Sequence, residues 1–307
     1  MTGSADKVES FSRAEVGWLV LVTVLAGVLR FIGLPDDGIS HFDEGVYVLW
    51  SAGTGYPFRE FFAPPLFPLL VRGASAVVGS SDLTAQAVSA FFGTAMVPLV
   101  WWVARRWYGR MASAATAPFV AFSSIHIAFS RMALTDVCFS FLFVLAMWLV
   151  SETIDCAFHV KLAQTGDRSR QPDLRGCLWA VAAGFAAGAA MNTKYNGLLV
   201  IVFAAGSLGL FAVIPALRHA VQWRRGVGCF TLVAATAGIL YLPWFWHVHS
   251  SYGYGRLLAH HRGYVAGWAN WPANLATLFL EQRVFSDFTG WVVPALGILA
   301  AIALSGR

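Results

Sequence analysis

Residues 16–34 read VGWLVLVTVLAGVLRFIGL, an apolar run that a single charged residue, Arg30, interrupts. A run of this length can cross a hydrocarbon core of roughly 30 Å as a helix. Further apolar runs follow along the chain, which has 307 residues, 58% of them hydrophobic and only 12% charged. Soluble domains usually carry roughly 25% charged residues. The composition therefore excludes an ordinary soluble domain and predicts an all-α, polytopic transmembrane helical bundle.

The apolar runs predict about eight spans and one shorter juxtamembrane helix. The predicted spans cover residues 16–34, 84–104, 111–129, 137–150, 177–191, 197–217, 226–246 and 291–304. Residues 64–79 form the further apolar run, which we interpret as a juxtamembrane helix in the first external loop. We expect a single transmembrane domain over residues 1–307, and a truncation at the C-terminus is one interpretation of the short tail after the last span.

The charged residues predict the sidedness of the bundle. The formal net charge is +5, but the basic residues cluster between apolar runs rather than along one face, which argues against nucleic acid as a partner. If residues 64–79 do not span, the basic clusters at 7–13, 105–110, 161–175 and 218–225 fall on one side, as the positive-inside rule requires. We therefore expect a multi-pass protein of the cytoplasmic (inner) membrane, with residues 151–176 as a cytoplasmic loop. The loops at 36–62, 130–136, 192–196 and 247–290 should be external.

Acidic residues lie in two of the predicted external loops. Asp43 and Glu44 are adjacent in HFDEGVY, residues 41–47, and Asp136 ends SRMALTD, residues 130–136. One interpretation is structural, since acids favour the first turn of a helix and Asp is a good N-cap. The functional hypothesis is that the two loops converge. It predicts that the carboxylates of Asp43 and Asp136 lie within about 10 Å of each other, around a cavity open to the outer face. This distance leaves room for an acceptor hydroxyl, a water or a metal between two negative charges whose unscreened repulsion would otherwise be costly.

Basic residues at the predicted external ends also have two interpretations each. Lys194 and Arg131 could reach the lipid headgroups by snorkelling, or they could bind an anion, because charge near membrane depth often marks a site. Arg30, near the end of the first span, could likewise contact lipid phosphate. His261, in HHRGY (residues 260–264), could bind a metal or a phosphate, although neighbouring loop histidines are usually only solvated. Trp244, Trp246, Trp268 and Trp271 suit an interfacial aromatic belt.

Several short motifs occur in an order that resembles a known family. They are Leu29-Arg30-Phe31, Asp43-Glu44-x-x-Tyr47, APPLF (63–67), RRWYGR (105–110), SRxALxD (130–136) and TKYxG (193–197). This order resembles the GT-C class of membrane glycosyltransferases, and within it the family 39 type, which includes protein O-mannosyltransferases and lipid A aminoarabinose transferases. The resemblance covers roughly residues 17–215. Ala63 departs from it, because relatives carry Lys or His before the Pro-Pro turn.

The resemblance implies a glycosyltransferase that moves a hexosyl or pentosyl group from a polyprenyl-phosphate donor to a lipid, glycan or protein acceptor at the outer face. By the same resemblance Asp43 is the base, with Glu44 and Asp136 orienting the acceptor or a cation. Lys194 and Arg131 would hold the phosphate, and Tyr47 and His261 would contact the substrate. No cofactor is certain, but three carboxylates could bind Mg²⁺ or Mn²⁺. The alternative is a non-catalytic transporter or flippase of lipid-linked substrates, which would share the apolar bundle and the external cations.

Overall fold

The protein is a bundle of helices. Its structure, a computed structural model, describes residues 11–53, 62–162, 174–214, 223–262 and 270–285. The helices that form the first part of the bundle are α1 (Arg13–Phe31), α4 (Asp82–Tyr108), the broken pair α5 (Arg110–Ala121) and α6 (Ser124–Arg131), and α7 (Thr135–Leu162). They are followed by α8 (Leu174–Met191), α9 (Leu198–Val213) and α11 (Trp223–Ser251). The shorter helices are α2 (Phe42–Ser51), α3 (Leu66–Val78), α12 (Gly253–Arg262) and α13 (Trp271–Phe285), with 3₁₀ turns η1 (Leu34–Asp36) and η2 (Tyr195–Gly197).

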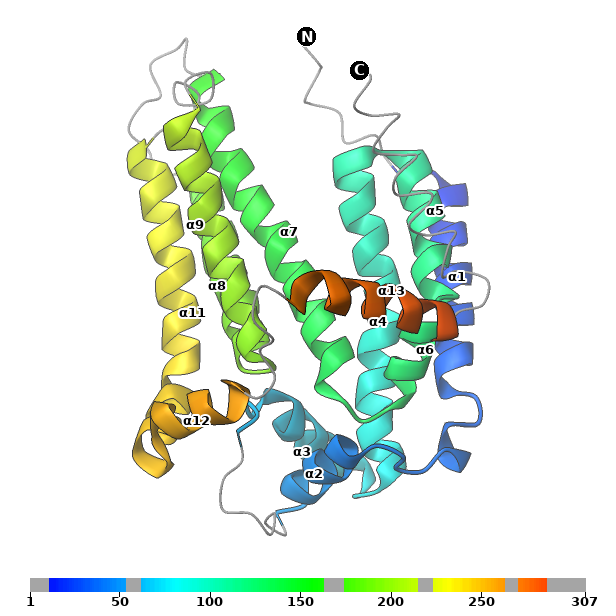
Figure 1. The fold of residues 1–307 in the computed structure, drawn as a ribbon. Helices are drawn as coiled ribbons and strands as arrows, with labels where there is room; N and C mark the ends of the chain where they lie inside the picture. The colour runs from blue at the N-terminus through cyan, green and yellow to red at the C-terminus, as the bar shows by residue number, and fades with distance from the viewer. Residues whose placement is uncertain (1–10, 54–61, 163–173, 215–222, 263–269, 286–307) are drawn as a thin grey trace.

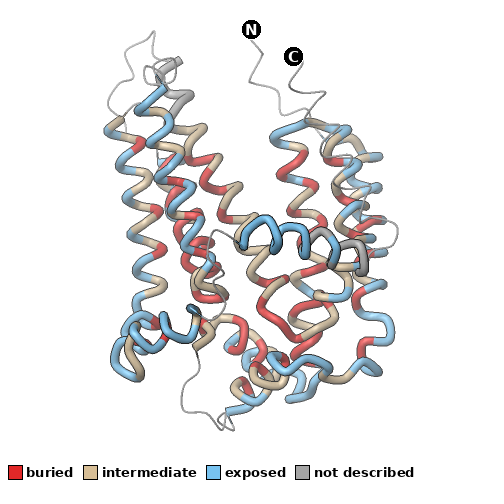
Figure 2. The backbone as a smooth tube through the Cα atoms, in the orientation of Figure 1, coloured by how far each residue is buried: buried red, intermediate tan, exposed pale blue. Residues whose placement is uncertain are grey.

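The long helices form two groups that stand side by side (Figure 1). In one group α4 packs against α1 and α5, and in the other α8 packs between α7 and α11. α7 joins the groups, because it also contacts α4. Buried residues follow the facing sides of these helices, whereas most outward positions are exposed (Figure 2). In α8, a Cβ on Gly184 would lie 2.6 Å from the Val233 carbonyl oxygen, so the small residue allows α8 and α11 to approach closely.

The helix lengths confirm a multi-pass membrane protein. Within the described residues, six helices are long and apolar enough to cross a membrane, or seven if the bent pair α5–α6 counts as one span. They correspond to seven of the eight predicted spans, and the predicted span 291–304 lies outside the described residues. The 13 residues of α3 measure about 20 Å at 1.5 Å per residue, too short for a span. The prediction that residues 64–79 do not cross the membrane is therefore confirmed.

Two ends of the bundle differ in their charged groups. We call one the arginine end, because it carries Arg105, Arg106 and Arg110 where α4 meets α5. The opposite end, which we call the site end, carries α2, α3 and α12 together with the turns before α7 and after α8 (Figure 1). All acids and cations singled out in the predicted external loops lie at the site end. Arg105, Arg106 and Arg110 thus lie at the end of the bundle opposite the candidate site (Figure 1).

Two boundaries and the exposure of one tryptophan differ from the sequence prediction. The predicted loop 151–176 begins as helix, because α7 continues to Leu162. Polar residues such as Glu152 extend this helix beyond the apolar run, and hydropathy marks only the apolar part. α11 likewise continues to Ser251, five residues past the predicted end of its span. On α11, Trp244 is buried (6% exposed) rather than part of an exposed aromatic belt, whereas Trp246 is 66% exposed.

The predicted span 111–129 is broken into α5 and α6, which meet at an angle of 52°. The break leaves the carbonyl groups of Val120 and Ala121 without helical partners, and Arg30 donates hydrogen bonds to both at 3.1 Å. Arg30 also contacts His126 and Ser130 of α6. Its side chain is fully buried, so the expectation that Arg30 contacts lipid phosphate was wrong. Backbone carbonyls freed by the break, rather than headgroups, satisfy this charge.

Candidate functional site

The site is built around an ion pair between two turns at the site end. The Lys194 ammonium lies 2.6 Å from Asp136 Oδ1, although the two residues are 58 positions apart. Asp136 is the second residue of α7, and Lys194 precedes η2. Their side chains are 42% and 40% exposed, respectively, so a ligand can reach both. An ion pair this exposed adds little stability, which leaves its charges available for another purpose.

The turn that carries Lys194 is held rigidly by its neighbours. Thr193 Oγ1 donates to the Ala189 carbonyl, and Asn192 Nδ2 donates to the carbonyls of Gly188 and Leu240. A Cβ on Gly197 would lie 2.3 Å from the Met191 backbone nitrogen, so only glycine allows the turn to fold back onto α8. The glycine of the TKYxG motif is therefore required for the turn, and the turn fixes the position of Lys194.

Asp43 lies on the exposed side of α2, in the first turn of that helix. Its carboxylate is 56% exposed. His41 is the N-cap of α2, and its Nδ1 accepts a hydrogen bond of 3.1 Å from the Asp43 backbone N–H. Asp43 therefore presents an accessible carboxylate, which is what a general base requires.

Tyr47 is a buried residue whose hydroxyl is affected by the charges of both Asp43 and Asp136. Its side chain is 9% exposed, and its hydroxyl hydrogen-bonds the side chain of Thr135, the residue before Asp136. Burial raises the pKa of Tyr47 to about 12; the Thr135 hydrogen bond opposes this shift, and the charges of Asp43 and Asp136 add to it. Both carboxylates thus act on one hydroxyl group. The separation of about 10 Å between them stays a prediction.

Glu44, next to Asp43, faces the opposite way. Its side chain is fully buried, and both carboxylate oxygens accept hydrogen bonds from the protein. The structure therefore buries Glu44, whereas Asp43, Asp136 and Lys194 are exposed.

Two further predicted residues make contacts elsewhere. The Arg131 guanidinium binds the Asp37 carboxylate at 2.7 and 2.8 Å and donates to the carbonyls of Leu29 and Ile32, at the end of α1. These contacts hold α6 against α1. His261 of α12 lies edge-on to the Tyr195 ring at 5.4 Å, with its Nδ1 2.9 Å from the Leu257 carbonyl oxygen. His261 therefore contacts Tyr195, the residue that follows Lys194 in the chain.

A cavity of about 710 Å³ lies between the two helix groups beside this site. Its walls come from helices of both groups and are mainly apolar. The lining residues include Trp50, Leu66, Phe92, Leu142, Leu240 and His247. Asn192 and Trp244 also line it, on the same turn and helix that hold Lys194 and Tyr195 in place. The cavity is thus mainly apolar, and its lining residue Asn192 lies two positions before Lys194 in the chain.

The central part of the sequence, which includes Asp136 and Lys194, matches a known family. Residues 61–252 match the dolichyl-phosphate-mannose-protein mannosyltransferase family. The chain belongs to this family. Its relatives include the polyprenol-phosphate-mannose–protein mannosyltransferases of two Mycobacterium tuberculosis strains, CDC 1551/Oshkosh and H37Rv, each 26% identical over 263 residues. The match covers 75% of this chain and 50% of each relative, so the chain spans about half the length of the mannosyltransferases it matches.

Solved structures show the same fold. ArnT from Cupriavidus metallidurans bound to undecaprenyl phosphate superimposes with a TM-score of 0.54 at 19% identity, over 76% of this chain and 42% of that one. The apo form of ArnT gives a TM-score of 0.58 at 20% identity, over 77% and 42%. The oligosaccharyltransferase of Archaeoglobus fulgidus gives 0.62 at 15% identity, over 75% and 29%. The GT-C-type helical bundle implied by the sequence motifs is confirmed.

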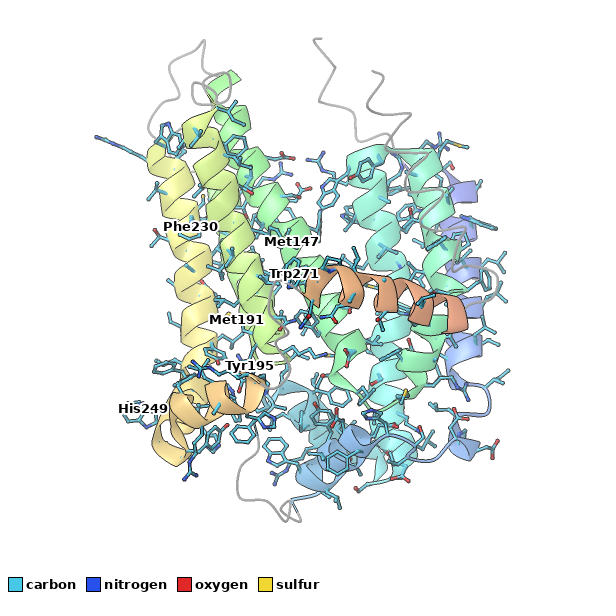
Figure 3. The ribbon with its side chains drawn as sticks, viewed as in Figure 1. Met147, Met191, Tyr195, Phe230, His249 and Trp271 are labelled. Atoms are coloured by element: carbon cyan, nitrogen blue, oxygen red, sulfur yellow. The ribbon has the colours of Figure 1, made fainter. Side chains whose placement is uncertain are left out.

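Two residues to which the sequence assigned no role hold this mannosyltransferase-family site together. The Tyr195 hydroxyl donates to the Phe62 carbonyl at 2.6 Å and accepts from Trp244 Nε1 at 3.2 Å. The Asn192 carbonyl accepts from the Leu66 backbone N–H at 2.7 Å. Tyr195 lies beside α12 and the end of α8 (Figure 3). These bonds join the turn that carries Lys194 to the segment around Ala63. The sequence signals for them were the place of Tyr195 in the TKYxG motif and the proximity of Asn192 to Lys194.

The donor set does not fit a divalent cation held by Asp43, Glu44 and Asp136 together. Both oxygens of Glu44 already accept N–H groups, and Asp136 Oδ1 binds Lys194. Among the described residues, no three His, Cys, Asp or Glu side chains gather in a way that could hold a metal ion. The positive charge that this arrangement places beside Asp136 is the ammonium of Lys194.

Proposed function

We propose that this chain transfers a sugar from a polyprenyl-phosphate donor to an acceptor hydroxyl at the external face of the cytoplasmic membrane. The observation that carries the proposal is the accessible Asp136–Lys194 pair, which lies beside an apolar cavity at the same end of the bundle as Asp43. Membership of the mannosyltransferase family supports the reaction class. The names of the mycobacterial relatives favour mannose as the sugar and a protein as the acceptor.

In this mechanism Asp43 is the general base. The acceptor hydroxyl oxygen attacks the anomeric carbon of the sugar while Asp43 takes the hydroxyl proton. The bond between the anomeric carbon and the phosphate oxygen breaks, and its electron pair stays on the polyprenyl phosphate that leaves. The transition state therefore gains negative charge on the phosphate. A fixed cation at that point lowers the barrier.

Lys194 supplies this cation. An ammonium has three donors, so Lys194 can hold Asp136 and a phosphate oxygen at the same time. The Asp136 carboxylate keeps the ammonium oriented, and the rigid turn around Gly197 keeps it in place. No metal ion is needed in this scheme, because Lys194 neutralises the leaving phosphate. Activity that survives a chelator such as EDTA would agree with it.

The cavity provides the place for the donor lipid. Its apolar walls suit an isoprenoid chain, and its Asn192 side lies next to the turn of Lys194. An apolar chamber with a few polar groups at one end is the usual form of a site for an amphipathic ligand. A lipid held there would place its phosphate near Lys194 and its sugar toward Asp43.

The decisive experiment is a transfer assay with the protein in liposomes. Radiolabelled polyprenyl-phosphate mannose and a Ser/Thr-containing acceptor peptide are supplied, and labelled peptide is measured. Asp43→Asn keeps the volume of the side chain but cannot take the proton, so the rate should fall by on the order of 10² to 10⁴-fold. Asp82→Asn is the matched control, because Asp82 is also an exposed acid in the first turn of a helix, α4. Near-normal turnover of Asp43→Asn would contradict the proposed base, and the absence of transfer from any polyprenyl-phosphate sugar would contradict the function.

A further inference from the structure

The two carboxylate oxygens of Glu44 make different kinds of contact. Oε1 accepts from neighbours in sequence: the Ser40 backbone N–H at 3.2 Å, the Ser40 hydroxyl at 3.3 Å and the His41 backbone N–H at 2.9 Å. Oε2 accepts from the Ala133 backbone N–H at 2.7 Å, which is 89 residues away. One oxygen therefore caps α2, and the other joins the first site-end loop to the second.

Helix capping alone does not explain why Glu44 is buried. A Glu at the third helical position commonly caps a helix from the surface, with its carboxylate in water. Burying a carboxylate is costly unless hydrogen bonds satisfy it fully. Here the side chain is fully buried because its second oxygen has to reach Ala133, which is itself buried. The long-range contact is thus the feature that the local cap does not explain.

Tyr47 makes a second contact with the same segment, one helical turn after Glu44. Its hydroxyl hydrogen-bonds the side chain of Thr135, so one face of α2 holds the segment at Ala133 and at Thr135. From α4, the Ser89 hydroxyl donates to the carbonyl of Leu134, between them. The three consecutive residues Ala133, Leu134 and Thr135 are all buried. The next residue is Asp136, whose carboxylate is exposed.

We infer that Glu44 is a positioning residue that sets the place of Asp136, and through it of Lys194, relative to Asp43. The short helix α2 then carries the proposed base, Asp43, on its exposed side and the two residues that hold the 133–135 segment, Glu44 and Tyr47, on its buried side. The inference rests on the proposed function for its catalytic meaning. It changes the role expected of Glu44 from the sequence, since a side chain without exposed surface acts through Asp136 rather than on substrate.

The Glu44→Gln substitution tests the contact of Oε2 separately from the contacts of Oε1. Glutamine also serves as the third residue of a capping box, so its carbonyl oxygen can keep the cap on Ser40 and His41. Its amide NH₂ then replaces Oε2 and faces the Ala133 N–H, donor against donor. The opposite amide orientation would set the NH₂ against two backbone N–H groups instead. Ser40→Ala is the matched control, because it removes one local bond to Oε1 and leaves the contact with Ala133.

Hydrogen–deuterium exchange tests the contact without any assay of transfer. In Glu44→Gln the amides of residues 133–136 should exchange faster than in the wild type, while those of α8 stay unchanged. In Ser40→Ala the 133–136 segment should keep its protection. If Glu44→Gln leaves the protection of this segment as it is in the wild type, Glu44 does not hold Asp136 and the inference is overturned.

Turnover tests the consequence. A displacement of about 1 Å at a catalytic group costs on the order of 10²-fold in rate, so kcat of Glu44→Gln should fall by roughly that factor while KM for the donor changes little. The double variant Glu44→Gln/Asp136→Asn should be no slower than the slower single variant, because both act through Asp136. The acidic limb of the pH profile of kcat/KM should persist in Glu44→Gln, since Asp43 remains the base.

Two outcomes of these kinetic measurements overturn the inference. Losses that multiply in the double variant would show that Glu44 acts independently of Asp136. Loss of the acidic limb in Glu44→Gln would show that Glu44 itself is the base. If the wild type transfers no sugar, the proposed function fails, and the exchange experiment alone then decides whether Glu44 places Asp136.

Discussion

The two ends of the bundle use the same kinds of charged residue in different ways. At the arginine end, Arg106 binds Glu152 at 2.8 Å and Asp155 at 3.2 Å, while Arg105 and Arg110 share Glu15 at 3.2 and 3.0 Å. These bonds connect α4 and α5 to α7 and α1. At the site end, Lys194 and Asp136 are both about two-fifths exposed beside an apolar cavity, with the exposed Asp43 at the same end.

The difference lies in where the acids are, more than in the number of charges. Glu15 and Glu152 are only 14% and 10% exposed, so their charges are used to join helices. Asp43 and Asp136 are 56% and 42% exposed, so their charges can act on a ligand. The buried acid of the site end, Glu44, again joins two segments. Burial thus sets Glu15, Glu152 and Glu44 apart from Asp43 and Asp136, whereas Asp155 and Asp37 bind arginines although they are 47% and 41% exposed. The predictions below test whether the two ends differ in function.

The sidedness of the two ends should give an all-or-none result. Phe42, beside Asp43, is 71% exposed, and Tyr108, at the arginine end, is 69% exposed, so both positions accept a cysteine probe. In a cysteine-free background, Phe42→Cys should react with an impermeant thiol reagent in intact cells, and Tyr108→Cys only after permeabilisation, because basic clusters favour the cytoplasmic side. Labelling of position 108 in intact cells would reverse the sidedness and place the site inside.

Removal of the site-end cation should cost activity more than stability. Lys194→Gln should lower kcat by about 10² to 10³-fold, the usual loss when a group that stabilises developing charge is removed. The melting temperature should change little, since an exposed ion pair contributes roughly 0–1 kcal/mol.

Arg106→Gln is the matched control at the arginine end. Arg106 is 41% exposed, close to the 40% of Lys194, and it also makes a short contact with an acid. It should lower the melting temperature while turnover per folded molecule stays near the wild type. Equal effects of the two variants on kcat would show that the ends do not differ in the way described here.

Tyr47 should give the smallest effect, at alkaline pH. Its pKa is raised to about 12 from the usual 10, so the folded state holds this proton more tightly than the unfolded state. The resulting stabilisation is complete below pH 10 and is lost as the pH rises from 10 to 12. At neutral pH the hydroxyl stays protonated and bonded to Thr135. In Tyr47→Phe, the phenolate absorbance that appears near pH 12 should be smaller than in the wild type; a loss of absorbance near pH 10 instead would contradict the raised pKa.

The candidate site shows how far linear patterns reach. Motif order and loop position selected Asp43, Asp136 and Lys194, which the structure places at one end of the bundle. The same reasoning selected Arg131, whose guanidinium instead binds Asp37 and the end of α1. It also expected Glu44 to orient the acceptor or a cation beside Asp43. Adjacent residues on a helix point in directions about 100° apart, and the direction that is buried depends on what packs there.

The sequence by itself determined the membrane class, the positions of most spans, the short helix that does not cross and the end at which the acids gather. These follow from the length of apolar runs and the placement of charges, which are local properties of a chain in lipid. Only the tertiary structure decided that Lys194 binds Asp136, that Glu44 turns inward to Ala133 and that Arg30 caps a broken span. Each of these contacts joins segments 58 to 100 residues apart. Helix packing and turn geometry set such distances, and no local pattern encodes them.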